Sequence, residues 1–272
     1  MAHQTEMQSR LLEMMKFFHD YCEANNLRYY TVGGTTLGAI RHGGFIPWDD
    51  DIDVGMPRKD YEKLIQIFGS VPREGYVIES IYSNNEDFYY AYSKLYDTTT
   101  TLIENTKTQV KRGMYIDIFP LDGAGGNEDE ALKHYEPIDK KKKLLGLRTI
   151  KINTRRTWYK NILLYIVQAM PDAIISEKRL CNQIDSLCKR LDFDNSVFVG
   201  NLTGAWGKKE IMPRELFGKP TLHAFESIQV YVQEDTNGYL THLYGDWRKL
   251  PTEEKRVSHH DYYLDLHRSY LE

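Results

Sequence analysis

The stretch FIPWDDDIDVGMPRKDY, residues 45–61, places four aspartates within five positions of a segment whose other residues are largely apolar and aromatic. Carboxylates this close raise one another's pKa and oppose burial unless a positive charge lies among them. Asp51 and Asp53 alternate with Ile52 and Val54, a period of two that is typical of a β-strand. We therefore expect Asp51 and Asp53 to lie on one face of a strand, beside a bound cation.

Upstream of the acidic stretch, the sequence indicates a helix, a strand and a glycine turn. Apolar residues recur at helical spacing over 5–25, and the β-forming run RYYTV at 28–32 ends at Gly33 and Gly34. We expect Thr35 to cap a helix that continues to about residue 40. Two glycines let the backbone approach a phosphate closely, and the N–H groups that start a helix favour an anion.

Downstream, the patterning predicts further strands, then helices, then a mixed C-terminal part, so the fold class is α+β. Pro57 suits the first turn of a helix that follows the acidic strand. Strands are expected at 76–82, 88–96 and 114–119, the last closed by Pro120. Helices are expected at 128–147, 158–170 and 177–191, then strands near Val197 and at 228–232 and a helix at 238–244.

The chain has 272 residues and a net charge of −4, with 41% hydrophobic and 27% charged residues, as in ordinary soluble proteins. It lacks the overall basic character of a nucleic-acid-binding protein. No apolar stretch approaches the roughly 20 residues that cross a bilayer, and the N-terminus lacks the layout of a secretory signal, so we expect a cytoplasmic protein. The three cysteines, Cys22, Cys181 and Cys188, are expected to be free buried thiols.

Magnesium is the cation that best fits the acidic strand, with manganese as the alternative, because Mg²⁺ binds carboxylates and shares phosphate oxygens of a substrate. A third carboxylate from a neighbouring strand is expected at Asp117, with Asp122 as the fallback. A calcium loop of the EF-hand type that begins at Asp49 would need glycine where Val54 stands, so that register fails. A solvated acidic loop is the remaining alternative, and the apolar neighbours of the aspartates argue against it.

Residues 33–61, GGTTLGAIRHGGFIPWDDDIDVGMPRKDY, resemble the signature of the LicD family of phosphocholine and related transferases. The likeness continues at 91–104, 113–123 and 239–260, whereas the helical middle offers little to match. The resemblance implies a nucleotidyltransferase-like mixed sheet flanked by helices. Together with the change to helical patterning near residue 128, it gives a catalytic core at 1–127, a helical region at 128–195 and a segment at 196–272 that completes one domain. It also implies transfer of phosphocholine from CDP-choline to a sugar hydroxyl of teichoic acid or another cell-surface glycan precursor.

The same resemblance assigns site residues. Asp51, Asp53 and Asp117 match the acids expected to be catalytic and metal-binding. The candidate substrate-binding residues are Gly33, Gly34, Thr35, Arg41, His42, Trp48, Tyr92, Lys94 and His259. For Arg41, His42 and Lys94, surface ion pairing is the alternative. Trp48 and Tyr92 are candidates because choline, a cation without a hydrogen to donate, is typically bound by aromatic faces; packing is the alternative.

The expected function also implies partners for the chain, and rival functions stay open. The acceptor is expected to be a lipid-linked glycan precursor, so peripheral contact with the inner membrane face is considered for the basic run Lys140–Lys143 and for residues 163–165. A solvated helix face and core packing are the respective alternatives. The rival functions are a transferase with another CDP-alcohol donor, a nucleotidyltransferase and a non-catalytic metal- or choline-binding module.

Overall fold

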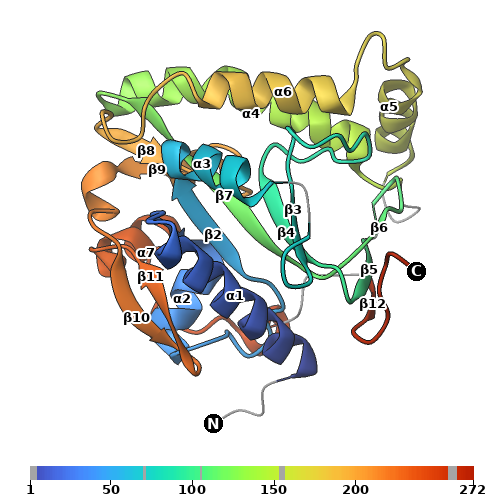
Figure 1. Ribbon diagram of the computed structural model, residues 1–272. Coiled ribbons are helices and arrows are strands. Elements are labelled where there is room, and N and C mark those ends of the chain that lie inside the picture. Colours follow the sequence, from blue (N-terminus) through green and yellow to red (C-terminus); the bar gives the residue numbers. More distant parts are fainter. Residues whose placement is uncertain (1–4, 70–71, 105, 153–156, 257–261) are drawn as a thin grey trace.

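The computed structural model describes residues 5–69, 72–104, 106–152, 157–256 and 262–272 and confirms the α+β fold class (Figure 1). A seven-stranded mixed sheet has the order β1-β2-β7-β4-β3, and β8 extends it by pairing with β7 and β9. Its strands are β1 (Tyr30–Thr31), β2 (Asp53–Pro57), β3 (Tyr76–Glu79), β4 (Ser93–Asp97), β7 (Tyr115–Gly125), β8 (Phe198–Gly200) and β9 (Ile211–Pro213). Only β2 and β7 pair in parallel; the other pairings in this sheet are antiparallel.

Helices and two small sheets surround this core. The helices are α1 (Glu6–Ala24), α2 (Gly33–His42), α3 (Arg58–Phe68), α4 (Glu128–Thr149), α5 (Trp158–Ala169), α6 (Glu177–Cys188) and α7 (Thr236–Tyr244). One small sheet contains β5 (Thr101–Glu104), β6 (Lys111–Arg112) and β12 (Tyr262–Asp265), and the other contains β10 (Thr221–Phe225) and β11 (Ile228–Val232). In Figure 1, α4 and α6 lie side by side along one end of the central sheet, and α5 lies at their outer end.

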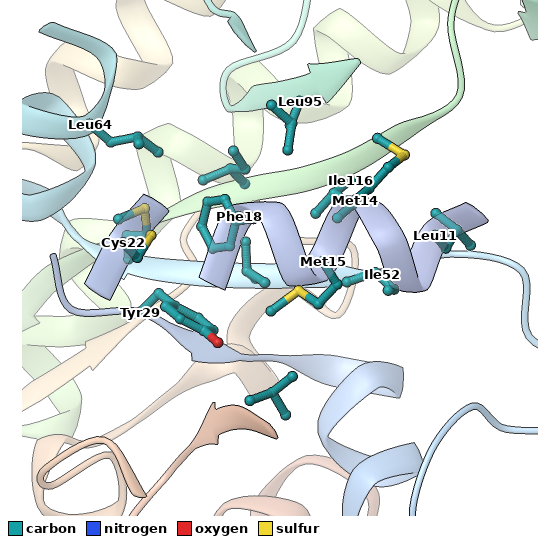
Figure 2. Close-up of a cluster of buried hydrophobic side chains, with 14 of the residues drawn as sticks. Leu11, Met14, Met15, Phe18, Cys22, Tyr29, Ile52, Leu64, Leu95 and Ile116 are labelled. Atoms are coloured by element: carbon teal, nitrogen blue, oxygen red, sulfur yellow. The ribbon is translucent and has the colours of Figure 1, made fainter. Parts of the chain in front are cut away.

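The first helix covers the face of the sheet that carries the core, as its apolar spacing predicts. Thr5 caps α1 with a capping box, which satisfies backbone N–H groups at the start of the helix. Figure 2 shows the buried side of α1, with Met14 beside Ile116 and Met15 beside Ile52 in one apolar cluster. The core is therefore fixed directly beneath the segment that enters β2.

A buried ion-pair network fastens α3 and α6 to the sheet. The Arg58 guanidinium donates to both carboxylate oxygens of Asp122 at 2.7 and 2.6 Å and to Asp185 at 2.7 Å. Tyr82 also donates to Asp185, at 2.7 Å. Since Arg58, Asp122 and Asp185 are all buried, Asp122 is a structural counter-ion, and the fallback prediction that it is a metal ligand has no support.

Several predicted boundaries were wrong. Strand β7 continues through Pro120. The residues of β7 before Pro120 pair with β4, and those after it pair with β8. Proline has no N–H to donate, but at this position no antiparallel hydrogen bond is lost. Helix α2 begins at Gly33 rather than at Thr35, and β2 begins at Asp53, so Asp51 precedes the strand. The expected strand at 88–96 is limited to β4, and β5, β6, β9, β10 and β12 were not predicted.

The three cysteines are buried free thiols, as expected. None of the described helices combines the length and the apolar character that spanning a bilayer requires.

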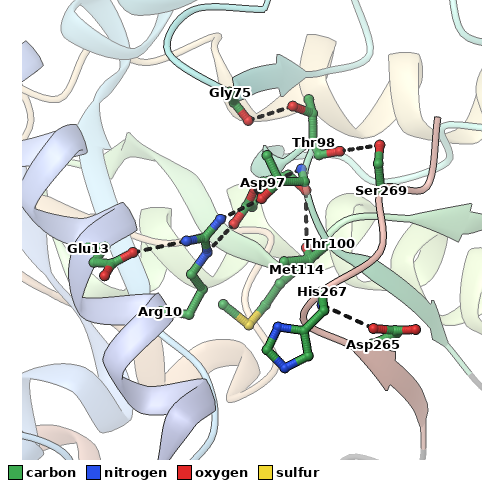
Figure 3. A network of polar contacts seen from close by, with 11 residues as sticks. Arg10, Glu13, Gly75, Asp97, Thr98, Thr100, Met114, Asp265, His267 and Ser269 are labelled. Atoms are coloured by element: carbon green, nitrogen blue, oxygen red, sulfur yellow. Dashed lines mark hydrogen bonds and ion pairs between the residues drawn. The ribbon is translucent and has the colours of Figure 1, made fainter. Parts of the chain in front are cut away.

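The turn after β4 is held by segments from both ends of the described chain (Figure 3). Arg10 of α1 donates to Asp97 at 2.6 Å, and Ser269 donates to the carbonyl of Thr98 at 2.7 Å. Tyr270 donates its backbone N–H to the carbonyl of Thr100 at 3.0 Å. These contacts fix the end of β4, the strand that carries Lys94.

Candidate active site

Two aspartates and a lysine meet on three adjacent strands of the central sheet. Asp53 of β2 pairs in register with Asp117 of β7, and Asp117 pairs in register with Lys94 of β4. Neighbouring strands lie about 4.8 Å apart, so the three side chains stand in one row across the sheet. The expectation that Asp117 lies beside the acidic strand is confirmed.

The first turn of α2 packs against the acidic stretch. A methyl group on Gly34 would lie 2.8 Å from Asp49 Oδ2, and one on Gly33 would lie 3.7 Å from Asp53 Oδ2. Gly33 also has a positive φ of 57° and donates its N–H to the Tyr239 hydroxyl at 2.9 Å. Glycine at position 34 is therefore needed for the close approach, and glycine at position 33 for the backbone conformation.

Thr35 has a different local role from the predicted helix cap. Its hydroxyl accepts a hydrogen bond from the backbone N–H of Asp53 at 2.8 Å. Val32 donates its N–H to the carbonyl of Asp53 at 3.1 Å. Thr35 and Val32 thus fix the backbone at the start of β2, and with it the position of the Asp53 carboxylate.

The electrostatics of the row reflect crowded, buried acids. Burial, together with the charges of Asp51, Asp117 and Asp49, raises the pKa of Asp53 well above its ordinary value. Burial raises the pKa of Asp117 to about 6, although the Lys94 ammonium opposes this increase. Two neighbouring carboxylates that both resist ionisation are a site where an additional positive charge would be stabilising.

Lys94 is a buried counter-ion, so the alternative that it forms a surface ion pair is wrong. Its side chain is 1% exposed, and its Nζ lies 3.1 Å from Asp117 Oδ1 and 3.6 Å from Glu104 Oε1. The same nitrogen lies 3.2 Å from the centroid of the Tyr115 ring and 4.4 Å from that of Tyr90. Lys94 therefore positions Asp117, and direct contact between Lys94 and a substrate phosphate stays a prediction.

A cleft of about 590 Å³ opens beside the acids. Asp49, Asp51 and Asp53 line it, together with Gly34 and Arg41. Aromatic residues also line this cleft, and they are Trp48, Trp206, Tyr244 and Trp247. The sequence analysis selected only Trp48 of these four; Tyr244 and Trp247 lie in the C-terminal block that resembles the LicD family, whereas Trp206 gave no signal. The cleft thus combines acids with aromatic faces.

Three predicted residues lie less directly at this cleft. The Arg41 side chain donates to the carbonyl of Trp247 at 2.9 Å and to His42 Nε2 at 3.0 Å, so it partly supports the cleft wall. His42 contacts the edge of the Trp48 ring with a centroid distance of 6.3 Å and is not among the cleft-lining residues. His259 lies outside the described residues.

Tyr92 lines a second cavity instead. This cavity has a volume of about 230 Å³ and is also lined by Tyr89, Tyr90 and Lys142. The Tyr92 ring packs against Phe119 with a centroid distance of 4.5 Å. Because Lys94 Nζ lies 5.8 Å from the centroid of the Tyr92 ring, the second cavity adjoins the Lys94–Asp117 pair from another side. A single aromatic cage made of Trp48 and the tyrosines near residue 90 is therefore not what the structure presents.

The donor set fits a hard divalent cation in chemistry, although the side chains are not in ligating positions. Among the residues that the structure describes, no three or more His, Cys, Asp or Glu side chains surround one point in the way a metal ion requires. However, Asp117 Oδ1 is buried without a formed hydrogen bond, and its nearest partner is the Lys94 ammonium. The side chains of Asp51, Asp53 and Asp117 would have to rotate to bind such an ion.

Comparison with known proteins identifies the family. Residues 26–159 match the family model described as LicD/FKTN/FKRP, nucleotidyltransferase domain. Over 94% of this chain and 95% of the relative, the sequence is 33% identical to the lipopolysaccharide cholinephosphotransferase LicD of Haemophilus influenzae. The chain belongs to the LicD family.

Two other relatives of this LicD-family chain match shorter segments. A segment of 74 residues is 38% identical to the human ribitol 5-phosphate transferase FKRP, covering 25% of this chain and 15% of that protein. A segment of 138 residues is 29% identical to mannosyltransferase regulator 4 of Saccharomyces cerevisiae, covering 48% of this chain and 11% of that protein. The similarity to Haemophilus LicD, in contrast, extends over nearly the whole chain.

Proposed function

We propose that this chain transfers phosphocholine from CDP-choline to a hydroxyl group of a cell-surface glycan precursor, such as teichoic acid, with Mg²⁺ or Mn²⁺ as cofactor. The observation that carries the proposal is the row of Asp53 and Asp117 beside a cleft that combines acids and aromatic faces. Near-full-length similarity to a lipopolysaccharide cholinephosphotransferase supports the choice of phosphocholine.

In this proposal Asp51, Asp53 and Asp117 would hold the divalent ion, which would supply positive charge to the diphosphate and to the departing phosphate oxygen. Gly34 of α2 lines the same cleft. The N–H of Gly33 already donates to Tyr239, and those of Thr35 and Thr36 donate to the carbonyl of Val32, so Gly34 is the candidate for a backbone contact with an anion. Lys94 compensates the charge of Asp117 and restricts its rotation through the contacts with Glu104 and Tyr115.

The chemical step is an in-line substitution at the phosphorus that bears choline. The acceptor oxygen forms a bond to phosphorus, the bond from phosphorus to the bridging oxygen breaks, and CMP leaves with that oxygen. In this proposal Asp117 receives the proton of the acceptor hydroxyl. The second cavity adjoins Asp117 through Tyr92 and Lys94, so we assign the acceptor to that side.

Choline recognition is assigned to the aromatic wall of the cleft rather than to Tyr92. The rings there already attract cations of the chain itself, since Arg248 lies 4.2 Å from the Trp247 ring centroid and Arg256 lies 5.6 Å from that of Trp48. Trp206 and Tyr244 meet edge to face with a centroid distance of 5.1 Å and form a corner beside the acids. A trimethylammonium group would fit such a corner through contact with the ring faces.

The proposal is tested by incubating the purified chain with Mg²⁺, CDP-choline and glycan acceptors, and by analysing both products by mass spectrometry. We expect CMP together with a phosphocholine-modified glycan. Asp51→Asn and Asp53→Asn should each lower kcat by about 10²-fold or more while the circular dichroism spectrum is unchanged. Asp20→Asn, which removes an exposed carboxylate of α1, is the matched control and should retain activity.

Other outcomes distinguish the rival functions. Cytidine found on the acceptor would identify a nucleotidyltransferase and refute phosphocholine transfer. Full cellular function of the Asp51→Asn and Asp53→Asn variants would favour a binding module without catalysis.

A CDP-polyol donor is the second candidate, because a segment of the chain is similar to a ribitol 5-phosphate transferase. The aromatic wall favours choline over a polyol, since a neutral polyol gains no cation–π attraction. If choline is the natural group, Trp206→Ala should raise the KM for CDP-choline at least about fivefold. Faster turnover of CDP-ribitol than of CDP-choline by the unmodified protein would reverse the assignment.

A further inference from the structure

Helix α5 presents an apolar surface to solvent. Of its twelve residues, only Leu164 and Val167 are buried. The exposed fractions of its large apolar residues lie between 48% and 74%, and these residues are Trp158, Tyr159, Ile162, Leu163, Tyr165 and Ile166. Figure 1 shows α5 at the outer end of α4 and α6, at the periphery of the molecule.

The exposed residues share one side of the helix. At 100° per residue, the six large apolar side chains occupy an arc of about 160°, centred opposite Leu164 and Val167. A surface helix of a globular protein normally directs such an arc into the core and its polar residues outward. In α5 the arrangement is reversed, so the arc requires a partner that is itself apolar.

The charge around α5 is positive. Between positions 140 and 171 the sequence contains nine Lys and Arg residues and no Asp or Glu. Lys151 and Lys160 are both exposed. Lys160 belongs to α5 and lies about 140° around the helix from the centre of the apolar arc. The nearby acids Asp172 and Glu177 both pair with Arg148, at 2.7 and 3.0 Å, so one of their two negative charges is compensated.

Other basic residues of this stretch serve the fold. Lys142 donates to the backbone carbonyls of Leu202 and Gly204 at 3.1 and 2.6 Å. Lys140 and Lys143 form exposed ion pairs with acids one turn earlier in α4. The run Lys140–Lys143 is therefore not the source of the surface charge beside α5.

We propose that α5 lies in the interfacial plane of an anionic phospholipid bilayer. Trp158, Tyr159 and Tyr165 have the amphipathic rings that favour the headgroup level, and aliphatic residues between them would enter the acyl boundary. Twelve residues extend about 18 Å, which is too short to span the hydrocarbon core but suitable for lying along its surface. The positive charge of the stretch complements anionic headgroups, whereas it would repel a second copy of the same face.

The proposal does not depend on which donor the enzyme uses, but it gives the proposed acceptor a route. Leu145, Gly146 and Thr149 of α4, the part of α4 on which α5 packs, also line the second cavity beside Tyr92. If the acceptor binds in that cavity, a lipid-linked glycan would reach it from the side on which α5 contacts the bilayer.

Vesicle sedimentation of the full chain tests the proposal. Vesicles of phosphatidylcholine alone are compared with vesicles of phosphatidylcholine mixed with phosphatidylglycerol, at low and high salt. We expect binding to the anionic vesicles that weakens with salt. Leu163→Gln combined with Ile166→Gln should weaken this binding at least about tenfold. Lys160→Glu, on the side of α5 away from the arc, should weaken it only about twofold.

Matched controls remove similar groups elsewhere. Leu132→Gln combined with Leu222→Gln changes two exposed leucines outside α5, and Lys219→Glu reverses an exposed charge; both variants should bind vesicles like the unmodified chain. CMP release with CDP-choline and a soluble acceptor should be unchanged in the α5 variants, which separates this proposal from the proposed function.

Two results would overturn the inference. The first is that the unmodified chain does not bind vesicles, or that the α5 variants and the control variants lose vesicle binding to the same extent. The other is a stable dimer, seen by light scattering, that Leu163→Gln with Ile166→Gln dissociates while vesicle binding is absent; the apolar arc would then be an interface between copies.

Discussion

Replacing Arg58 with methionine should destabilise the protein strongly, because the guanidinium bonds two buried carboxylates in different elements. Asp122 loses both hydrogen bonds from Arg58, whereas Asp185 keeps its hydrogen bond with Tyr82 and its ion pair with Lys189. Removing one partner of a buried ion pair costs about 3–5 kcal/mol. With an unfolding entropy typical of 272 residues, Tm should fall by roughly 5–9 °C.

Urea unfolding followed by circular dichroism measures this loss. Lys143→Met is the control, because it breaks an exposed pair with Asp139 and should change the free energy of unfolding by less than about 0.5 kcal/mol. Adding Asp122→Asn to Arg58→Met should restore part of the stability, since the uncompensated charge disappears. A loss below about 1 kcal/mol in Arg58→Met would refute the view that this network fastens α3 and α6 to the sheet.

The pH dependence gives an independent check. Burial raises the pKa of Asp122, and Arg58 opposes that increase, so the variant should hold the proton on Asp122 more tightly still. A carboxyl whose pKa is higher in the folded than in the unfolded state stabilises the fold as pH falls. The stability deficit of Arg58→Met should therefore shrink between about pH 7 and pH 5. A deficit that grows over this range would contradict the reasoning.

Lys94→Met should lower kcat/KM for phosphocholine transfer by about 10²-fold, because Asp117 loses its counter-ion. Lys94→Arg should recover part of the activity. An unchanged rate in Lys94→Met would show that the ion pair is irrelevant to transfer. Gly34→Ala should reduce kcat about tenfold with little change in Tm, since its methyl group displaces the carboxylate of Asp49, and full activity would exclude that contact. Burial raises the pKa of Glu210 to about 7. As pH rises from about 5 to about 8, this buried carboxyl must ionise, so the unmodified chain should lose up to about 3 kcal/mol of stability. Glu210→Gln has no such group and should not show this loss. Parallel pH curves for these two proteins would count against the burial of that charge.

The helices and the central acidic strand were predictable because their signals are local. Apolar spacing placed α1, α4, α5 and α6 close to their observed bounds. The short strands β5 and β12 carry no such signal, since they depend on each other across more than 150 positions. Pro120 misled the prediction because its tolerance in β7 depends on where neighbouring strands stop, which the local sequence does not reveal.

The carboxylates of the site were predictable, but its walls were not. Alternation on one strand and the block around Asp117 sufficed to place Asp53 and Asp117 together. The aromatic wall comes from residues near 206 and 244–247, which reach the cleft only through the packing of α7 and its neighbouring loops. Tyr92 was wrongly grouped with Trp48, because crowding of aromatics in sequence does not reveal which cavity each ring faces.

The turn that follows β4 also constrains how the protein can be made. The Thr98 carbonyl accepts its hydrogen bond from Ser269, a residue 171 positions later in the chain. At ordinary translation speeds, a ribosome needs roughly 10–30 s to synthesise that interval. During this time water bonds the Thr98 carbonyl, so the native contacts around the end of β4 are completed only after residues near 270 have emerged.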